Sequence, residues 1–221
     1  VVIVSYARTP IGSFCGSLSS VSATKLGSAA IKGAIEKINL PKDSVDQVIM
    51  GNVLSAGLGQ APARQASIYS GLSESVECLT INKMCGSGLK AIMLAQESIL
   101  LGNADIVIAG GMENMSQSPH LLNNSRVGNK MGDSKLIDSM INDGLWDVYN
   151  DKHMGSCGEM CAEKYDFSRE QQDEFAKKSY LKSQEAINSD IFKNEIVPVE
   201  VFRRKDSVMI DRDEEPFRVD F

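Results

Sequence analysis

The sequence lacks an apolar run long enough to cross a membrane. A spanning helix needs about 20 consecutive apolar residues, and stretches such as Val107 to Ala109 with their neighbours are far shorter. It also lacks a basic excess, because 23 Lys and Arg residues face 29 Asp and Glu residues, a net charge of −6. Neither nucleic acid nor a membrane is therefore expected as a main partner. A few local positive groups could still bind an anionic ligand.

Signs of export are missing as well. Val1 to Tyr6 form a β-branched run instead of a basic stretch followed by an apolar one, so no signal peptide is visible. The five cysteines are an odd number in a chain that is not small, and we expect free thiols in a reducing compartment. These features favour the cytoplasm, with the mitochondrion after removal of a targeting segment as the alternative.

The first half of the chain alternates between strand and helix patterns. Hydrophobic residues make up 43% and charged residues 24%, as in ordinary globular proteins. β-Branched or apolar runs bounded by turn residues predict strands, and apolar residues at helical spacing predict helices. The predicted strands are 1–6, 45–53, 76–81 and 105–109, and the predicted helices are 23–38, 60–69 and 86–101. Short strands that alternate with helices indicate a layered α/β fold.

The pattern changes after about residue 116. We expect a short helix over 135–141, a long helix that begins at Ser168 with a capping box to Gln171, and paired strands over 196–202 and 208–210. The chain therefore divides into an α/β part, residues 1–116, and a mixed appendage, residues 117–221. No closing element precedes Phe221, from which we expect the fold to be completed by further sequence.

One segment, Asn82-Lys-Met-Cys85-Gly-Ser-Gly-Leu-Lys-Ala91, favours chemistry. Cys85 is predicted at a strand-to-helix turn, where free N–H groups and the positive end of the helix dipole stabilise a thiolate. The glycines allow close approach of a substrate, and the Cys85 N–H could help to hold an oxyanion. The alternative is a buried structural cysteine at a packed turn.

This segment resembles the nucleophile motif of the thiolase family, and further segments resemble family landmarks in the right order along nearly the whole chain. They are Ala7-Arg-Thr-Pro-Ile-Gly-Ser13, Gly51-Asn-Val53, Gln60-Ala-Pro-Ala-Arg-Gln65, Ala109-Gly-Gly-Met-Glu-Asn-Met-Ser116, Lys130-Met-Gly-Asp133, Asp143-Gly-Leu145, His153-Met-Gly155, Glu170-Gln-Gln-Asp173 and Asn194-Glu-Ile-Val-Pro198.

The resemblance implies a five-layered α-β-α-β-α fold of two similar halves. Residues 1–116 would belong to the first half, which carries the nucleophile, and 117–221 to an incomplete loop domain for coenzyme A binding and tetramerisation. The family's second half carries an Asn-Glu pair, a Gly-His-Pro motif and a second cysteine in a Cys-x-Gly-Gly-Gly stretch. Neither the Gly-His-Pro motif nor the Cys-x-Gly-Gly-Gly stretch occurs here, so we expect the 221 residues alone to be inactive.

The activity that the resemblance implies is acyl transfer with Cys85 as the catalytic acyl carrier. An acetyl-CoA C-acetyltransferase joins two acetyl-CoA molecules into acetoacetyl-CoA and CoA by a reversible Claisen condensation, with CoA thioesters as substrates and no prosthetic group. A homo-oligomer, as a dimer of dimers, is expected, with Met131 reaching toward a neighbouring dimer. The alternatives are a long-chain 3-ketoacyl-CoA thiolase, a condensing enzyme that uses acyl-carrier protein, and a non-catalytic CoA-binding or oligomerisation module.

The resemblance also suggests binding residues for coenzyme A. Leu145, His153 and Met154 match positions that line the pantetheine arm, and His153 favours short substrates. Arg218 matches an arginine that stacks on adenine. Loop packing for the first three and a solvated surface position for Arg218 are the alternatives.

A metal site is a weaker interpretation of one cysteine pattern. His153, Cys157 and Cys161 recur at intervals of four residues, so that a helix through them would present all three on one face. No fourth ligand is close in sequence. We therefore expect a packed helix face and no metal.

Overall fold

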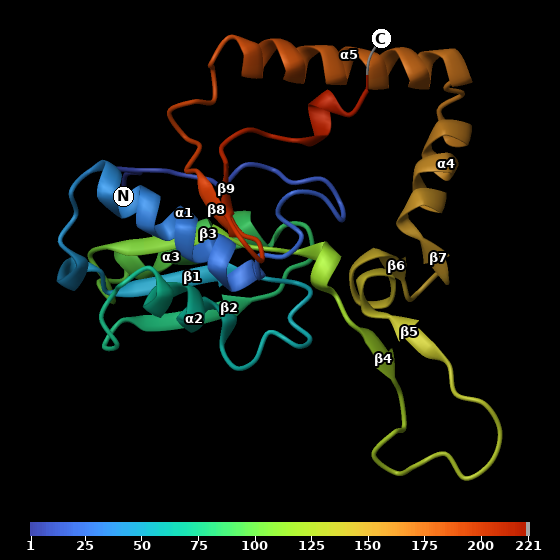
Figure 1. Ribbon diagram of the computed structural model, residues 1–221, viewed down its shortest axis with the longest axis horizontal. Helices are drawn as coiled ribbons and strands as arrows, with labels where there is room; N and C mark the ends of the chain where they lie inside the picture. The colour runs from blue at the N-terminus through green and yellow to red at the C-terminus, as the bar shows by residue number, and fades with distance from the viewer. Residues whose placement is uncertain (220–221) are drawn as a thin grey trace.

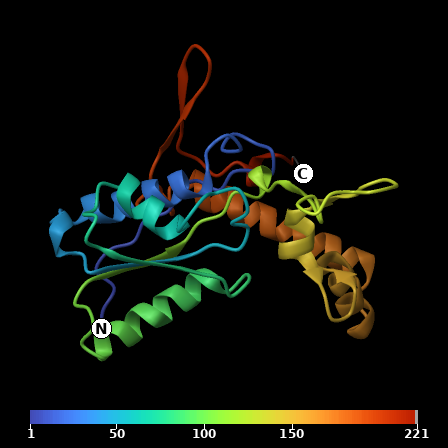
Figure 2. The same ribbon diagram turned by 90° about the horizontal axis from the view of Figure 1, so that it is seen from below.

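A computed structural model describes residues 1–219 (Figure 1). The first part is a parallel three-stranded sheet in the order β2-β1-β3, formed by β1 (Gln47–Gly51), β2 (Glu77–Ile81) and β3 (Val107–Gly111). Figure 2 shows α1 (Ala23–Lys37) and α2 (Pro62–Tyr69) on one face of the sheet and α3 (Ser87–Leu100) on the other. The predicted α/β class is confirmed.

The central strand β1 is buried on both faces, which explains its continuous apolar sequence. Val48 and Met50 pack into the cluster under α1 and α2. Ile49, between them, points the other way and packs against Ala91 and Ala95 of α3. Successive side chains of a strand point to opposite faces of the sheet, so a separate apolar core forms between the sheet and each helix layer.

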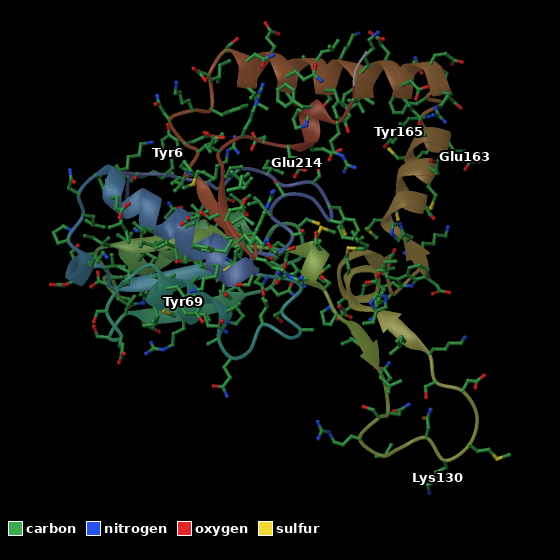
Figure 3. The ribbon with its side chains drawn as sticks, viewed as in Figure 1. Tyr6, Tyr69, Lys130, Glu163, Tyr165 and Glu214 are labelled. Atoms are coloured by element: carbon green, nitrogen blue, oxygen red, sulfur yellow. The ribbon has the colours of Figure 1, made fainter. Side chains whose placement is uncertain are left out.

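The second part begins with a protruding arm. After a 3₁₀ turn, η2 (Met115–Gln117), the strands β4 (His120–Leu122) and β5 (Leu136–Asp138) pair antiparallel. The loop between them extends away from the rest of the molecule, with Lys130 at its far end (Figure 3). Met131, beside it, is 98% exposed.

The elements that follow the arm are mostly helical. A π-helix, η3 (Met140–Leu145), leads into the short hairpin of β6 (Trp146–Asp147) and β7 (Lys152–His153). Two helices follow, α4 (Met154–Lys164) and α5 (Arg169–Asn188). The predicted capping box at the start of α5 is confirmed: Ser168 Oγ accepts from Gln171 N–H, and the Gln171 side chain accepts from Ser168 N–H.

The end of the chain returns to its beginning. The predicted pair of strands forms β8 (Val199–Phe202) and β9 (Ser207–Ile210), before a last 3₁₀ turn, η4 (Glu215–Phe217), beside α5. Val199 and Val201 pack on Leu18 and on Leu26 of α1. The boundary at residue 116 stays a prediction, and the last two residues of the 117–221 segment lie outside the described residues.

An ion-pair network, called here the Arg8 clasp, fastens this return. The Arg8 guanidinium donates from Nη1 and Nη2 to the two carboxylate oxygens of Asp213, at 2.7 and 3.0 Å, and from Nε to Glu195 at 2.6 Å. Ile11 N–H also donates to Asp213, at 2.8 Å. Burial pushes the pKa of Asp213 up, but these bonds and the Arg8 charge together hold it below its usual value.

Two local predictions are wrong. Residues 1–6 form no strand, because β3 lies across an apolar cavity of about 490 Å³ lined by both segments. Residues 135–141 form no α-helix, because β5 pairs with β4 and Asp138 then accepts from Met140 N–H at 2.8 Å, which turns the backbone into the π-helix.

Within residues 1–219, no helix is both long and apolar enough to span a bilayer.

Candidate active site

Cys85 lies in a tight turn that joins β2 to α3, as the sequence predicts. The residue before it, Met84, has a φ of +48°, in the left-handed region that side chains rarely adopt. Asn82 holds this conformation, because its Oδ1 accepts from Met84 N–H at 3.0 Å. Cys85 therefore lies on a strained turn directly before the helix, and it is exposed to solvent.

Ser87, the first residue of α3, closes the turn from the helix side. Its Oγ accepts from Lys83 N–H at 2.8 Å and donates to Met84 carbonyl at 2.6 Å. Gly86 N–H donates to Lys83 carbonyl at 3.1 Å. These bonds fix the backbone on both sides of Cys85.

Glycines bring the start of α3 against the carboxyl ends of the strands. A Cβ on Gly51, the last residue of β1, would lie 2.6 Å from Ser87 Cβ and 2.9 Å from Gly88 N. A Cβ on Gly111, the last residue of β3, would lie 3.5 Å from Gly88 Cα. The positive end of the α3 dipole therefore sits at the edge of the sheet where ligands of open α/β folds bind.

A cavity of about 440 Å³, called here the Cys85 cavity, opens at this edge. Its lining combines the nucleophile turn and the start of α3 with residues of the π-helix. The lining residues are Gly51, Asn52, Val53, Leu54, Met84, Cys85, Ser87, Gly88, Gly111, Met112, Glu113, Met115, Met140, Gly144 and Leu145. Of the predicted binding residues, the cavity brings Leu145 together with Cys85.

Glu113 is the ionisable carboxyl group of this cavity. Its Oε1 accepts from Asn52 Nδ2 at 2.8 Å and from Leu54 N–H at 3.1 Å, and its Oε2 accepts from Val53 N–H at 2.9 Å. Burial raises the pKa of Glu113, and the effect outweighs the three hydrogen bonds, which act in the opposite direction. No role was predicted for Glu113 from the sequence. The signal that could have found it is a glutamate just beyond the carboxyl end of a predicted strand.

His153 and Met154 lie at the start of α4, outside the set that lines the Cys85 cavity. The His153 Nδ1 accepts from Gly155 N–H at 2.9 Å and so caps the helix, while its ring meets the Trp146 ring edge-on with centroids 6.5 Å apart. Met154 is exposed.

Arg218 lies far along the chain, at the end of η4. It forms an ion pair with Glu215 at 3.7 Å, and its side chain is 57% exposed. It does not line the Cys85 cavity.

The other four thiols are free. Cys15 and Cys161 are exposed, whereas Cys78 and Cys157 are half-buried. A helix does run through residues 154–164, as the cysteine spacing required, but among residues 1–219 no group of three His, Cys, Asp or Glu side chains is arranged to hold a metal ion.

Comparison with known proteins gives a family match over almost the whole chain. The profile described as "Thiolase, N-terminal domain" matches residues 1–219. The acetyl-CoA acetyltransferase 2 of Arabidopsis thaliana is 53% identical over 216 residues, which are 97% of this chain and 54% of the relative. A mitochondrial acetyl-CoA acetyltransferase of Mus musculus is 51% identical over 222 residues, 100% of this chain and 52% of the relative. A cytosolic acetyl-CoA acetyltransferase of Gibberella zeae is 52% identical over 217 residues, 97% and 54% of the two chains. The chain spans about half the length of these relatives.

Proposed function

The chain belongs to the thiolase family through its N-terminal domain, and from that premise we propose that the whole protein is an acetyl-CoA C-acetyltransferase. It joins two acetyl-CoA molecules into acetoacetyl-CoA and CoA, and it catalyses the reverse thiolysis. Relatives at 51–53% identity that carry this name support the proposal. The observation that supports it most is the position of Cys85: the residue is exposed on the turn before α3, and it lines one cavity together with Leu145.

The first half-reaction needs only an exchange of thioesters. The Cys85 thiolate attacks the carbonyl carbon of acetyl-CoA, the bond from that carbon to the CoA sulfur breaks, and the departing CoA thiolate takes a proton. The new acetyl-cysteine is itself a thioester, so the acetyl group keeps its transfer potential. The position of Cys85 at the α3 N-terminus favours the anionic nucleophile and the oxyanion that forms next.

The second half-reaction makes a carbon–carbon bond. A base removes an α-proton from a second acetyl-CoA, and the resulting carbanion attacks the acetyl carbon on Cys85. The sulfur of Cys85 then leaves as a thiolate. We propose that the bases for both steps come from outside these 221 residues, in the part of the protein that corresponds to the other half of the relatives. The chain itself supplies the acyl carrier.

For substrate binding, we propose that Leu145, His153 and Met154 line the pantetheine arm and that Arg218 stacks on the adenine. The place of Leu145 in the Cys85 cavity supports the first assignment. The assignment of His153 has indirect support, because the pairing of β6 with β7 places His153 opposite Trp146, the residue next to Leu145. The Arg218 assignment rests on the match to a family arginine. Its side chain is exposed and forms only a weak ion pair with Glu215, at 3.7 Å, so that it is available to a ligand.

The remaining features of the proposal concern assembly and place. The protein uses CoA thioesters as substrates and no prosthetic group. We propose a homo-oligomer, a dimer of dimers, because the arm between β4 and β5 stands clear of the core and carries Met131 fully exposed. The compartment is the cytoplasm, or alternatively the mitochondrion, because one relative is named as cytosolic and another as mitochondrial.

The test is the chain-length preference of the natural full-length protein. We expect kcat/KM for thiolysis to be highest with acetoacetyl-CoA and to fall with longer 3-ketoacyl chains. Cys85→Ser should reduce turnover by at least about a thousandfold, because the hydroxyl is a far weaker nucleophile. A protein that uses a palmitoyl-length substrate equally well is a long-chain thiolase. One that binds CoA without any turnover is the non-catalytic module.

A further inference from the structure

Glu113 connects the end of one strand to the loop that follows another. It is the second residue after β3, while its three donors belong to residues 52–54, directly after β1. β1 and β3 are neighbours in the sheet, and Gly51 pairs with Gly111 at their carboxyl ends. One carboxylate therefore orients three consecutive residues that line the Cys85 cavity.

The orientation of Asn52 depends on this carboxylate. Asn52 is 2% exposed, and its Nδ2 is shared between Glu113 at 2.8 Å and the Met112 carbonyl at 3.1 Å. Its Oδ1 is buried without a hydrogen-bond partner among the described residues. The amide is thus held from its nitrogen side alone, and the loss of Glu113 as an acceptor would remove one of the two contacts that hold it.

Leu54 connects Glu113 to the π-helix. Its N–H donates to Glu113, and its side chain packs directly on the π-helix, where a Cβ on Gly144 would lie 3.3 Å from Leu54 Cδ2. Leu54 is 9% exposed, so this contact is part of a packed layer. Leu145, the next residue after Gly144, lines the Cys85 cavity together with the nucleophile.

We propose that Glu113 is a positioning residue for the CoA thioester. By holding residues 52–54, and through the packing of the Leu54 side chain on the π-helix, it sets the distance between Leu145 and Cys85. Its carboxylate does not act on the reacting atoms. The inference rests on the proposed function for its kinetic readout. It predicts a change in substrate binding with little change in the chemical step.

The main variant is Glu113→Gln in the natural full-length protein. The amide keeps the shape of the side chain, but its NH₂ group replaces one acceptor oxygen, so at least one of the three donors of residues 52–54 faces another donor. We expect KM for acetoacetyl-CoA in thiolysis to rise about tenfold, while kcat changes less than about threefold. The rate at which iodoacetamide labels Cys85 should stay within about twofold of the wild type.

A matched control removes a carboxylate elsewhere in the same domain. Glu36→Gln on α1 breaks only an exposed pair with Lys32 at 3.7 Å, and its KM and kcat should equal those of the wild type. Leu54→Ala tests the connecting contact and should also raise KM without a comparable loss of kcat. Because both residues act along one route, the double variant should raise KM by less than the product of the two single effects.

Three results would overturn the inference: a KM for Glu113→Gln equal to that of Glu36→Gln, a loss of kcat at constant KM, or fully multiplicative effects with Leu54→Ala. If Glu113→Gln does not fold, Leu54→Val decides, since a raised KM supports the route and an unchanged KM refutes it. Failure of the proposed function is separable. A wild type without any thiolysis refutes that function, and calorimetric titration with CoA alone still reports whether Glu113→Gln weakens binding about tenfold, as the route requires.

Discussion

The Arg8 clasp predicts that two aspartates, each paired with an arginine, contribute very differently to the free energy of unfolding. Asp213 accepts two hydrogen bonds from Arg8 and one from Ile11 N–H, and its side chain is only 7% exposed. In Asp213→Asn, an NH₂ group of the same shape would face the guanidinium, and Arg8 would keep Glu195 as its charged partner. Removal of one partner from a buried ion pair costs about 3–5 kcal/mol.

We expect the lower end of that range, about 3 kcal/mol of unfolding free energy, because Arg8 is 28% exposed and retains Glu195. The control is Asp173→Asn in α5, which removes the partner of Arg169 in an exposed pair at 2.8 Å. Here water replaces the lost contact, so no measurable change is expected. Urea unfolding followed by circular dichroism, applied to both variants of the full-length protein, measures the difference. Equal midpoints for the two variants would refute the reasoning.

The same clasp predicts the direction of a pH effect. Since the folded protein holds the pKa of Asp213 below its usual value of 3.8, the ionised carboxylate contributes stability at neutral pH and loses it as the pH falls through the lowered pKa. The stability gap between the wild type and Asp213→Asn should therefore be constant near neutrality and shrink below pH 3.8. A gap that persists undiminished in acid would show that the charge of Asp213 is not what stabilises the clasp.

Three further predictions follow from the site and its supports. Limited iodoacetamide treatment and mass mapping should find Cys85 modified before the other four cysteines; earlier modification of any of those would contradict its assignment as the nucleophile. Gly51→Ala should lower the unfolding free energy by about 1–3 kcal/mol, because the new Cβ meets the backbone of α3, whereas Gly158→Ala in α4, where nothing lies within 4 Å, should be neutral or stabilising in the same urea assay. Ser168→Ala should cost about 1 kcal/mol through loss of the α5 cap, and an unchanged urea midpoint would show that the capping box contributes nothing.

Elements whose signals are local could be predicted from the sequence. The capping box at Ser168 defines the start of α5, and the apolar spacing over residues 23–38 gives α1 almost to its bounds. Residues 135–141 were assigned wrongly, because β5 is formed by pairing with His120–Leu122 and no pattern within the segment reports that partner. Residues 1–6 have a strand sequence without a neighbouring strand to pair with among the described residues.

In the candidate site, too, the features with local sequence signals were predictable and those that depend on distant residues were not. The position of Cys85 was predictable because β2, the turn and α3 are contiguous, and a glycine-rich start of a helix is visible in the sequence. The role of Glu113 was not, because it depends on β1 and β3 being neighbours, which brings residues 52–54 to a glutamate 59 to 61 positions further along the chain. Likewise, the packing of Leu54 on Gly144 joins the two parts of the chain across a distance that no local pattern encodes.

The Arg8 clasp also has a consequence for the order in which the protein can fold as it is synthesised. Arg8 and Asp213 are 205 residues apart, so at 5–20 residues per second roughly 10 to 40 s pass between the synthesis of the two partners. During that interval Arg8 has no carboxylate from Asp213, and the β8–β9 hairpin that covers Leu18 and Leu26 does not yet exist. The nascent chain must therefore carry an uncovered apolar patch for tens of seconds, which makes early chaperone contact and late closure the expected course of its folding.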